Sequence, residues 1–320
     1  MATALTARLD RDLLRRWMPV VTLVFLVAIV GSLQPEFLAP ATLLQLGGDT
    51  ATLFVLATGV TFVIMLGGID LSIQAMASLA SVIVALTVSS LGYASLLLAV
   101  LTGAVAGALA GLAHVKLKIP SFIATLAVGG VLAGTALVLS HERSITLDDT
   151  QRPYLAWVTG TTAGIPHEVI VGVLVLLLAH VVQSRTRFGR YSAAIGAGEA
   201  AAYASGVKVD RQKVIAFTLS AAFAGFAGVI LAGRLASGSP TLANELLLPA
   251  IAAVVVGGTA ITGGVGSVWR TLVGSLIISV VRVGMTFVGV NIFAQQIVFG
   301  AVLTLAVAAT IDRSKMPVVK

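Results

Sequence analysis

The sequence predicts an all-α membrane protein with about ten transmembrane helices, both termini in the cytoplasm, and two inverted halves that contain broken helices. Three observations predict this class. Of the 320 residues, 58% are apolar and only 10% are charged, with a mean hydropathy of +1.05; soluble domains carry about 25% charged residues. Apolar runs close to the ~20 residues that cross a bilayer recur along the chain. Basic clusters between these runs are typical of cytoplasmic loops.

The first 183 residues are expected to hold a basic cytoplasmic start, residues 1–16, and six spans. Gly47, Gly48 and Asp49 interrupt the second apolar region, so we expect a short helix, a kink, and then span 2 with Asp49 as its N-cap. GGIDLS, Gly67 to Ser72, turns the chain into span 3, whose start Asp70 is expected to cap. The six spans cover residues 17–33, 50–66, 71–89, 93–113, 121–139 and 168–182, and residues 140–167 form the longest external loop.

Between the halves lies a polar stretch, residues 184–213, with six basic residues. Its Ala-rich run from Gly198 to Ser205 favours a short helix, and Gly206 suits a left-handed C-cap just past the end. Such a helix under the membrane would let a soluble partner push on the membrane part. An ordinary connecting loop is the alternative that composition alone leaves open.

The second half is expected to contain spans at residues 214–235, 246–261, 269–288 and 295–311, then a cytoplasmic tail, residues 312–320. GGTAITGGVGS, Gly257 to Ser267, is interpreted as a broken, re-entrant helix. Sixteen of the twenty Lys and Arg then lie in the cytoplasm and three outside, which fits one orientation. Arg282 falls within a span, where we expect it to snorkel or to pair with a carboxylate or backbone carbonyls. Spans 2–5 and 7–10 run in opposite directions, a common transporter plan.

The sequence contains no motif that would carry enzyme chemistry. A phosphate-cradling GxxxxGK[ST] loop, an HExxH motif and a GxSxG elbow are all missing. There is no Cys, and the four His are isolated, so neither a thiolate site nor a metal-ligand spacing exists. We therefore expect no catalytic, cofactor-binding or metal site. The net charge of +7 follows the loops rather than a nucleic-acid surface.

Four runs carry a resemblance to the permease subunits of ribose-type sugar ABC importers. They are VTFVIMLGGIDLS (residues 60–72), IPSFIATLA (119–127), FGRYSAAIGAGEAAAYASGVKV (188–209) and LPAIAAVVVGGTAITGGVGS (248–267), and together they extend the resemblance from about residue 41 to the end. The family usually has Gly-Gly-Asn before the Glu of the third run, where this chain has Gly196, Ala197 and Gly198. It often continues GGIDLS with Val-Gly, where this chain has Ile73 and Gln74.

The resemblance implies a membrane permease without its own ATPase, in the bacterial inner membrane. Its partners would be an ABC ATPase subunit that uses ATP and Mg, a periplasmic sugar-binding protein, and a second permease in a homodimer or a paralogous heterodimer. Residues 184–213 would be the ATPase-coupling segment, with the short helix as a cytoplasmic coupling helix. The coupling residues carried over are Gly189, Arg190, Gly196, Glu199, Ala200, Ala201, Ser205 and Gly206.

The resemblance also implies a translocation pathway for a monosaccharide or polyol, which needs hydrogen-bond partners but no countercharge. The candidates are polar residues in or beside spans, and helix–helix hydrogen bonding is the alternative role for them. Other substrates of related ABC importers remain open: nucleosides, amino acids or a signalling furanose. An ion-coupled secondary transporter is a further alternative, although it would want a central carboxylate. The pathway candidates are Asp70, Ser72, Gln74, Thr259, Thr262, Gln295 and Gln296.

Overall fold

The computed structural model describes residues 2–310, without the side chains of residues 2–16, 292, 293, 309 and 310; the predicted tail, residues 312–320, lies outside them. The long helices are α1 (Ala2–Leu33), α2 (Pro40–Ile64), α3 (Ile73–Leu91), α4 (Ala94–Lys116), α5 (Ser121–Ser140), α7 (His167–Arg185), α10 (Val209–Arg234), α12 (Val268–Phe287) and α13 (Ile292–Thr310). The short helices are η1 (Pro35–Leu38), η2 (Arg152–Leu155), α6 (Ala156–Thr159), α8 (Arg187–Ala197), α9 (Glu199–Ala204), η3 (Asn244–Leu246) and α11 (Leu247–Val256). Two antiparallel pairs are formed by β1 (Ile145–Thr146) with β4 (Ser237–Gly238) and by β2 (Thr161–Thr162) with β3 (Ile165–Pro166).

The helices confirm the all-α membrane class. Among the described residues, seven helices are long and apolar enough to cross a bilayer: α2, α3, α4, α5, α7, α10 and α12. Three shorter apolar helical stretches, Trp17–Leu33, Asn244–Val256 and Ala294–Ala308, occupy the places of predicted spans 1, 8 and 10. The count of ten spans and the side on which the termini lie stay predictions.

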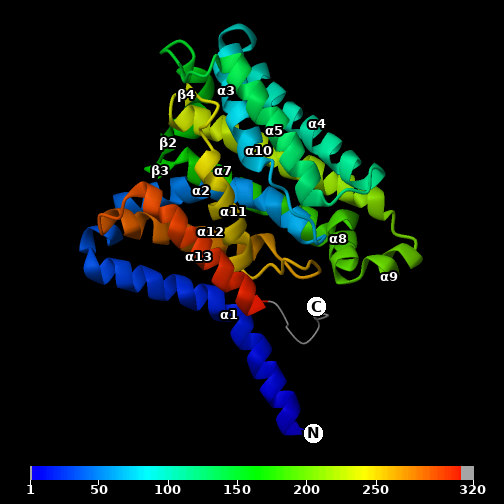
Figure 1. Ribbon diagram of the computed structural model, residues 1–320. Helices are drawn as coiled ribbons and strands as arrows, with labels where there is room; N and C mark the ends of the chain where they lie inside the picture. The colour runs from blue at the N-terminus through cyan, green and yellow to red at the C-terminus, as the bar shows by residue number, and fades with distance from the viewer. Residues whose placement is uncertain (1, 311–320) are drawn as a thin grey trace.

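Several predicted boundaries were wrong. Helix α2 runs unbroken through Gly47, Gly48 and Asp49, because a glycine in a helix interior costs only about 1 kcal/mol, which packing against α7 can offset. Asp49 is therefore not an N-cap; its side chain bonds Arg234 of α10 instead. Helix α1 begins at Ala2 and is continuous with the predicted first span (Figure 1). Helix α10 starts at Val209, earlier than the predicted residue 214, whereas α11 is only ten residues long.

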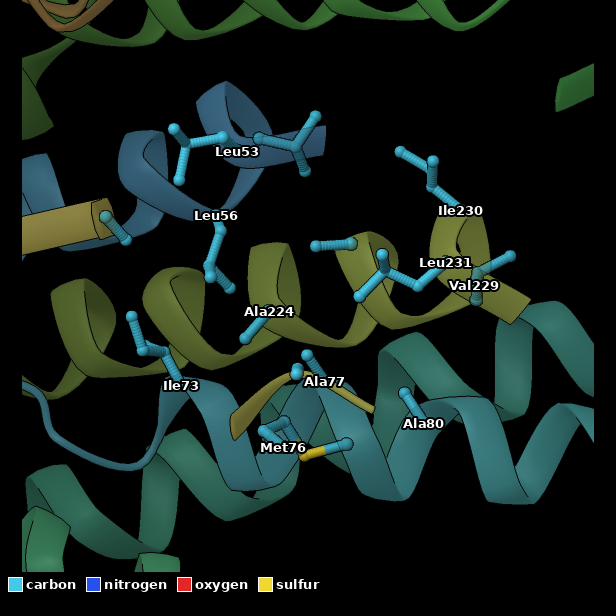
Figure 2. Packing of buried hydrophobic residues seen from close by; sticks show 14 of the residues in the cluster. Leu53, Leu56, Ile73, Met76, Ala77, Ala80, Ala224, Val229, Ile230 and Leu231 are labelled. Carbon is cyan, nitrogen blue, oxygen red and sulfur yellow. The ribbon is translucent and has the colours of Figure 1, made fainter. Parts of the chain in front are cut away.

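The core lies where α2, α3, α4 and α10 meet. Figure 2 shows side chains from three of these helices packed together, among them Leu56 of α2, Met76 of α3 and Ile230 of α10. All three are fully buried. Burial of such side chains inside the bundle leaves the outer faces of α4, α5 and α7 apolar and exposed, as expected for helices in contact with lipid.

A glycine seam joins α4 to α10. Gly103, Gly107 and Gly111 stand one turn apart on α4, and a Cβ on each would collide with backbone atoms of α10. Gly225 of α10 makes the reciprocal approach to the backbone of α4 near Ala99. These small residues therefore let the backbones of α4 and α10 approach closely.

Two quartets of helices, α2 to α5 and α10 to α13, have the same internal packing. In the first quartet α3 packs on α4 and α5, and in the second α11 packs on α12 and α13. The leading helix of each quartet crosses into the other: α10 packs on α3 and α4, and α2 packs on α11 and α12. Figure 1 shows α3, α4, α5 and α10 grouped on one side and α1, α12 and α13 on the other. This reciprocal arrangement supports the hypothesis of two inverted halves.

Both Gly-rich runs break the helices, as the sequence indicated. The chain is non-helical between α2 and α3, and again between α11 and α12. Gly67, Gly258, Gly263 and Gly264 have positive φ angles, which L side chains rarely adopt. The two breaks touch each other, because the amide of Gly264 donates to the carbonyl of Met65 at 3.0 Å.

Candidate functional site

A cavity of about 620 Å³ opens between the N-terminal half of α2, the end of α10, the start of α11 and the C-terminal half of α12. Under the predicted orientation this is the external side of the membrane. The polar residues that line it are Thr42, Gln45, Asp49, Thr52, Arg234, Thr241, Glu245, Ser279, Arg282 and Thr286. A cavity of this size suits a small ligand, since ligand pockets are typically about 300–1,000 Å³.

Two helical stripes supply most of the polar lining. On α2 the polar residues Thr42, Gln45, Asp49 and Thr52 are spaced by three or four positions, so they share one face. On α12, Ser279, Arg282 and Thr286 do the same. Neither stripe was predicted from the sequence, although the spacing of polar side chains within apolar helices is visible in it.

Arg234, at the end of α10, forms the centre of an ionic cluster beside the cavity. Its Nε lies 3.0 Å from Oε1 of Glu168 on α7, and its Nη2 is paired with Oδ1 of Asp49 on α2. Nη1 points to the carbonyl of Gly48 at 3.5 Å and to the hydroxyl of Thr52 at 3.4 Å. The guanidinium therefore joins three helices. A Cβ on Gly48 would collide with Glu168, so the glycine leaves room for the Glu168 carboxylate.

Arg282 behaves differently, although it lines the same cavity. Its side chain is exposed, and within the part of the chain that the structure describes its guanidinium has no hydrogen bond or ion pair. The predicted pairing with a carboxylate or with backbone carbonyls is therefore not formed. Glu245 likewise lines the cavity with its carboxylate free of such partners in the described residues, and only its backbone carbonyl accepts a bond, from Gln296 at 3.3 Å.

At the opposite end of α10, residues 184–213 fold into α8, α9 and the first turn of α10. Helix α9 spans Glu199–Ala204 and ends as predicted, with Gly206 at φ +82°. The amides of Gly206 and Val207 donate to the carbonyls of Tyr203 and Ala202 at 2.9 and 3.1 Å, which is a Schellman cap. The short helix that the Ala-rich run predicted is thereby confirmed, while its role as a coupling helix is a prediction.

The coupling residues carried over from the resemblance fall into two groups. Buried Gly189 and half-buried Gly196 make close approaches: a Cβ on Gly189 would collide with the carbonyl of Gln183, and one on Gly196 with the carbonyl of Met65 and the amide of Gly264. Gly196 thus holds α8 against both broken segments. The exposed group consists of Arg190, Glu199, Ala200, Ala201, Ser205 and Gly206.

Two contacts with the first turn of α10 fix α8 and α9. Lys213 donates to both carboxylate oxygens of Glu199 at 2.8 Å. The amide nitrogen of Gln212 donates to the carbonyl of Phe188 at 2.8 Å and to the hydroxyl of Ser192 at 3.0 Å. Ala202 is the buried residue of α9, so the rest of this short helix presents alanines and the 74%-exposed Tyr203 outward.

None of the seven predicted pathway residues lines the cavity. Asp70 is buried and its Oδ1 accepts hydrogen bonds from the amide and the hydroxyl of Ser72, at 2.9 and 2.6 Å. The N-cap of α3 is Ser72, so the predicted capping by Asp70 was wrong. Gln74 is half-buried, Thr259 is buried and Thr262 is exposed. Gln295 donates to the Thr286 hydroxyl at 3.3 Å, which places it just behind the cavity wall. Gln296, as described above, bonds the backbone of Glu245.

The loops on the predicted external side are tied together against α3. Ile145 and Thr146 of β1 pair with β4, and the amide of Ala243 donates to the buried hydroxyl of Ser78 at 3.0 Å. In the exposed loop after β1, a hydrogen bond from the Thr150 hydroxyl holds the pKa of Asp148 below its usual value.

Comparison with known proteins decides the family. A family model described as the permease component of branched-chain amino acid transport systems matches residues 42–307. The chain belongs to this family of transport permeases. The family consists of transport components rather than enzymes. No solved structure matches the chain significantly.

Curated relatives cover nearly the whole permease. It is 40% identical to the ribose import permease protein RbsC of Bacillus subtilis (strain 168), over 93% of this chain and 92% of the relative. The RbsC protein of Escherichia coli (strain K12) is 36% identical, with 90% and 91% covered. The D-allose transport system permease protein AlsC of the same strain is 30% identical, with 89% and 88% covered. The resemblance to ribose-type importer permeases is thereby confirmed.

Proposed function

We propose that this permease forms the translocation pathway for a monosaccharide or related polyol in an ABC importer of the bacterial inner membrane. The observation that carries the proposal is the polar cavity between α2 and α12, in a chain whose relatives include ribose and allose permeases. Its stripes of hydroxyl, amide and charged groups offer many hydrogen-bond partners within otherwise apolar helices. A polyhydroxylated solute needs such a lining.

The partners follow from the same proposal. Helix α9 is the coupling helix that inserts into a separate ABC ATPase, which binds the ATP and Mg. Its exposed alanines and Tyr203 form a compact apolar surface, and the Schellman cap and the Glu199–Lys213 pair give it a fixed position. A periplasmic sugar-binding protein delivers the solute to the external loops, and a second permease completes the pathway.

Helix α10 provides the mechanical link between the two sites. Its first turn bonds α8 and α9 through Gln212 and Lys213, and its last residue, Arg234, holds the cavity wall. The helix has 26 residues and is therefore about 39 Å long. When the ATPase dimer closes and moves α9, a stiff helix of this length carries the displacement to the cavity.

The test is uptake by proteoliposomes that contain this permease, its cognate ATPase and its binding protein. We expect uptake of a sugar or polyol that requires ATP inside and persists when a protonophore collapses the proton gradient. A nucleoside or an amino acid as the transported solute would overturn the substrate class. Uptake that proceeds without the ATPase and stops with the protonophore would instead favour an ion-coupled transporter.

A further inference from the structure

Two arginines line the cavity, and their environments assign them different tasks. Arg234 donates to two carboxylates, a backbone carbonyl and a hydroxyl, and its side chain is 23% exposed. A guanidinium has five N–H donors in a fixed planar fork, so these contacts occupy most of its capacity. Arg234 is therefore a positioning residue that holds α2, α7 and α10 together.

Arg282 retains its full donor capacity. It lies on the polar stripe of α12 between Ser279 and Thr286, and no described side chain engages its guanidinium. An ionisable residue inside a transmembrane helix is a functional candidate, because its placement there is costly unless a partner or water satisfies it. The cavity places the Arg282 fork where a transported solute can provide that partner.

The charges around the cavity indicate what kind of solute this is. The ionisable residues of the lining are Asp49, Glu245, Arg234 and Arg282, and Glu168 is bonded to Arg234 from behind. The lining itself therefore carries two carboxylates and two guanidiniums, which balance, and Glu168 behind Arg234 brings the formal charge of the surroundings to −1. An anion such as a sugar acid or sugar phosphate would meet this excess negative charge, whereas an uncharged solute would not.

We propose that Arg282 is the specificity-determining side chain of the cavity and that it donates to hydroxyl oxygens of an uncharged polyol. The planar fork can donate two parallel hydrogen bonds to neighbouring oxygens. Gln45 on α2 and Glu245 on η3, both without side-chain partners in the described residues, provide acceptors for hydroxyl hydrogens in the same space. The inference rests on the proposed function and adds the contacting residue and the charge state of the substrate.

The first experiment compares uptake of two sugars that differ in the configuration of one hydroxyl, in the complete reconstituted importer. The binding protein is the same for every variant, so a change in the ratio of the two rates arises in the permease. For Arg282→Ala we expect the better substrate to lose about tenfold or more, as for a charged hydrogen bond worth about 1.5–3 kcal/mol, and the ratio to change. Arg282→Lys, which keeps the charge but not the fork, should also change the ratio. Arg143→Gln, an exposed loop arginine, is the matched control.

A second experiment tests the charge of the cavity. Because the chain has no cysteine, Thr286→Cys introduces a single thiol into the lining. We expect a positively charged methanethiosulfonate to modify it faster than a negatively charged one, and the transported sugar to slow both reactions. Val105→Cys, on the exposed apolar face of α4, should stay unmodified by either reagent.

The outcomes separate the two proposals. If the wild-type importer transports a polyol and the rate ratio is unchanged in Arg282→Ala and Arg282→Lys, the role of Arg282 is overturned and the proposed function stands. Faster modification by the negative reagent would overturn the charge argument. Failure of the wild-type importer to transport any uncharged polyol, with uptake of an amino acid, would overturn the proposed function itself.

Discussion

Arg234 makes a residue-scale prediction about stability. Arg234→Gln removes its charged hydrogen bonds to Asp49 and Glu168 and leaves two carboxylates close together. We expect a loss of about 1.5–3 kcal/mol for each charged hydrogen bond, seen as a lower thermal unfolding midpoint of the purified permease in detergent. Arg282→Gln should leave that midpoint near the wild-type value, because its guanidinium has no described partner. Equal losses in both variants would contradict the division of tasks between the arginines.

Glu199 allows a test of how α9 is positioned. Glu199→Arg places a second cation against Lys213, so we expect α9 to shift and ATP-dependent uptake to fall sharply. The double variant Glu199→Arg with Lys213→Glu restores the ion pair in reverse, and uptake should recover. A double variant that remains inactive would instead indicate that the Glu199 carboxylate itself contacts the ATPase.

At the scale of single elements, the seam between α4 and α10 predicts a steep steric effect. Gly107→Leu would drive a side chain into the backbone of α10 at Phe217. We expect a destabilisation of about 1–3 kcal/mol, the usual range for overpacking, together with a lower yield of folded permease. Gly134→Leu on α5 is the control, because nothing lies within 4 Å of that position. Similar melting of both variants would show that the seam tolerates separation.

Elements were predicted from the sequence to different degrees. Apolar periodicity located the long helices, and helix propensity with a terminal glycine located α9. The continuity of α2 was not predicted, because Gly47 and Gly48 pack against Val169 and Glu168 of α7, which are distant in sequence. The cavity was not predicted for a related reason. In the sequence Asp49 resembles a local N-cap, whereas in the structure it pairs with Arg234, which is distant in sequence. Polar residues beside the Gly-rich breaks were predicted to line the pathway, whereas the polar stripes of α2 and α12 were not predicted.

For the whole molecule, the orientation in the membrane can be tested directly. Single cysteines in this cysteine-free chain report which side each loop occupies. We expect Ser205→Cys to react with an impermeant thiol reagent only after the membrane is permeabilised, and Ser144→Cys to react in intact spheroplasts. Both positions are exposed in the structure. Labelling of Ser205→Cys in intact spheroplasts would overturn the topology and, with it, the assignment of α9 to an ATPase.

The missing Cβ atoms along the seam also limit how the permease can change shape. Helices whose backbones touch through interdigitated glycines have no loose side chains to rearrange, so sliding one past the other would break many close contacts at once. Helices α4 and α10 therefore travel as a single piece. Any opening and closing must be taken up elsewhere, where α10 packs on α2 or where α2 packs on α12, the two helices that carry the polar stripes. The rigid contact between α4 and α10 thus determines which other helix contacts can open.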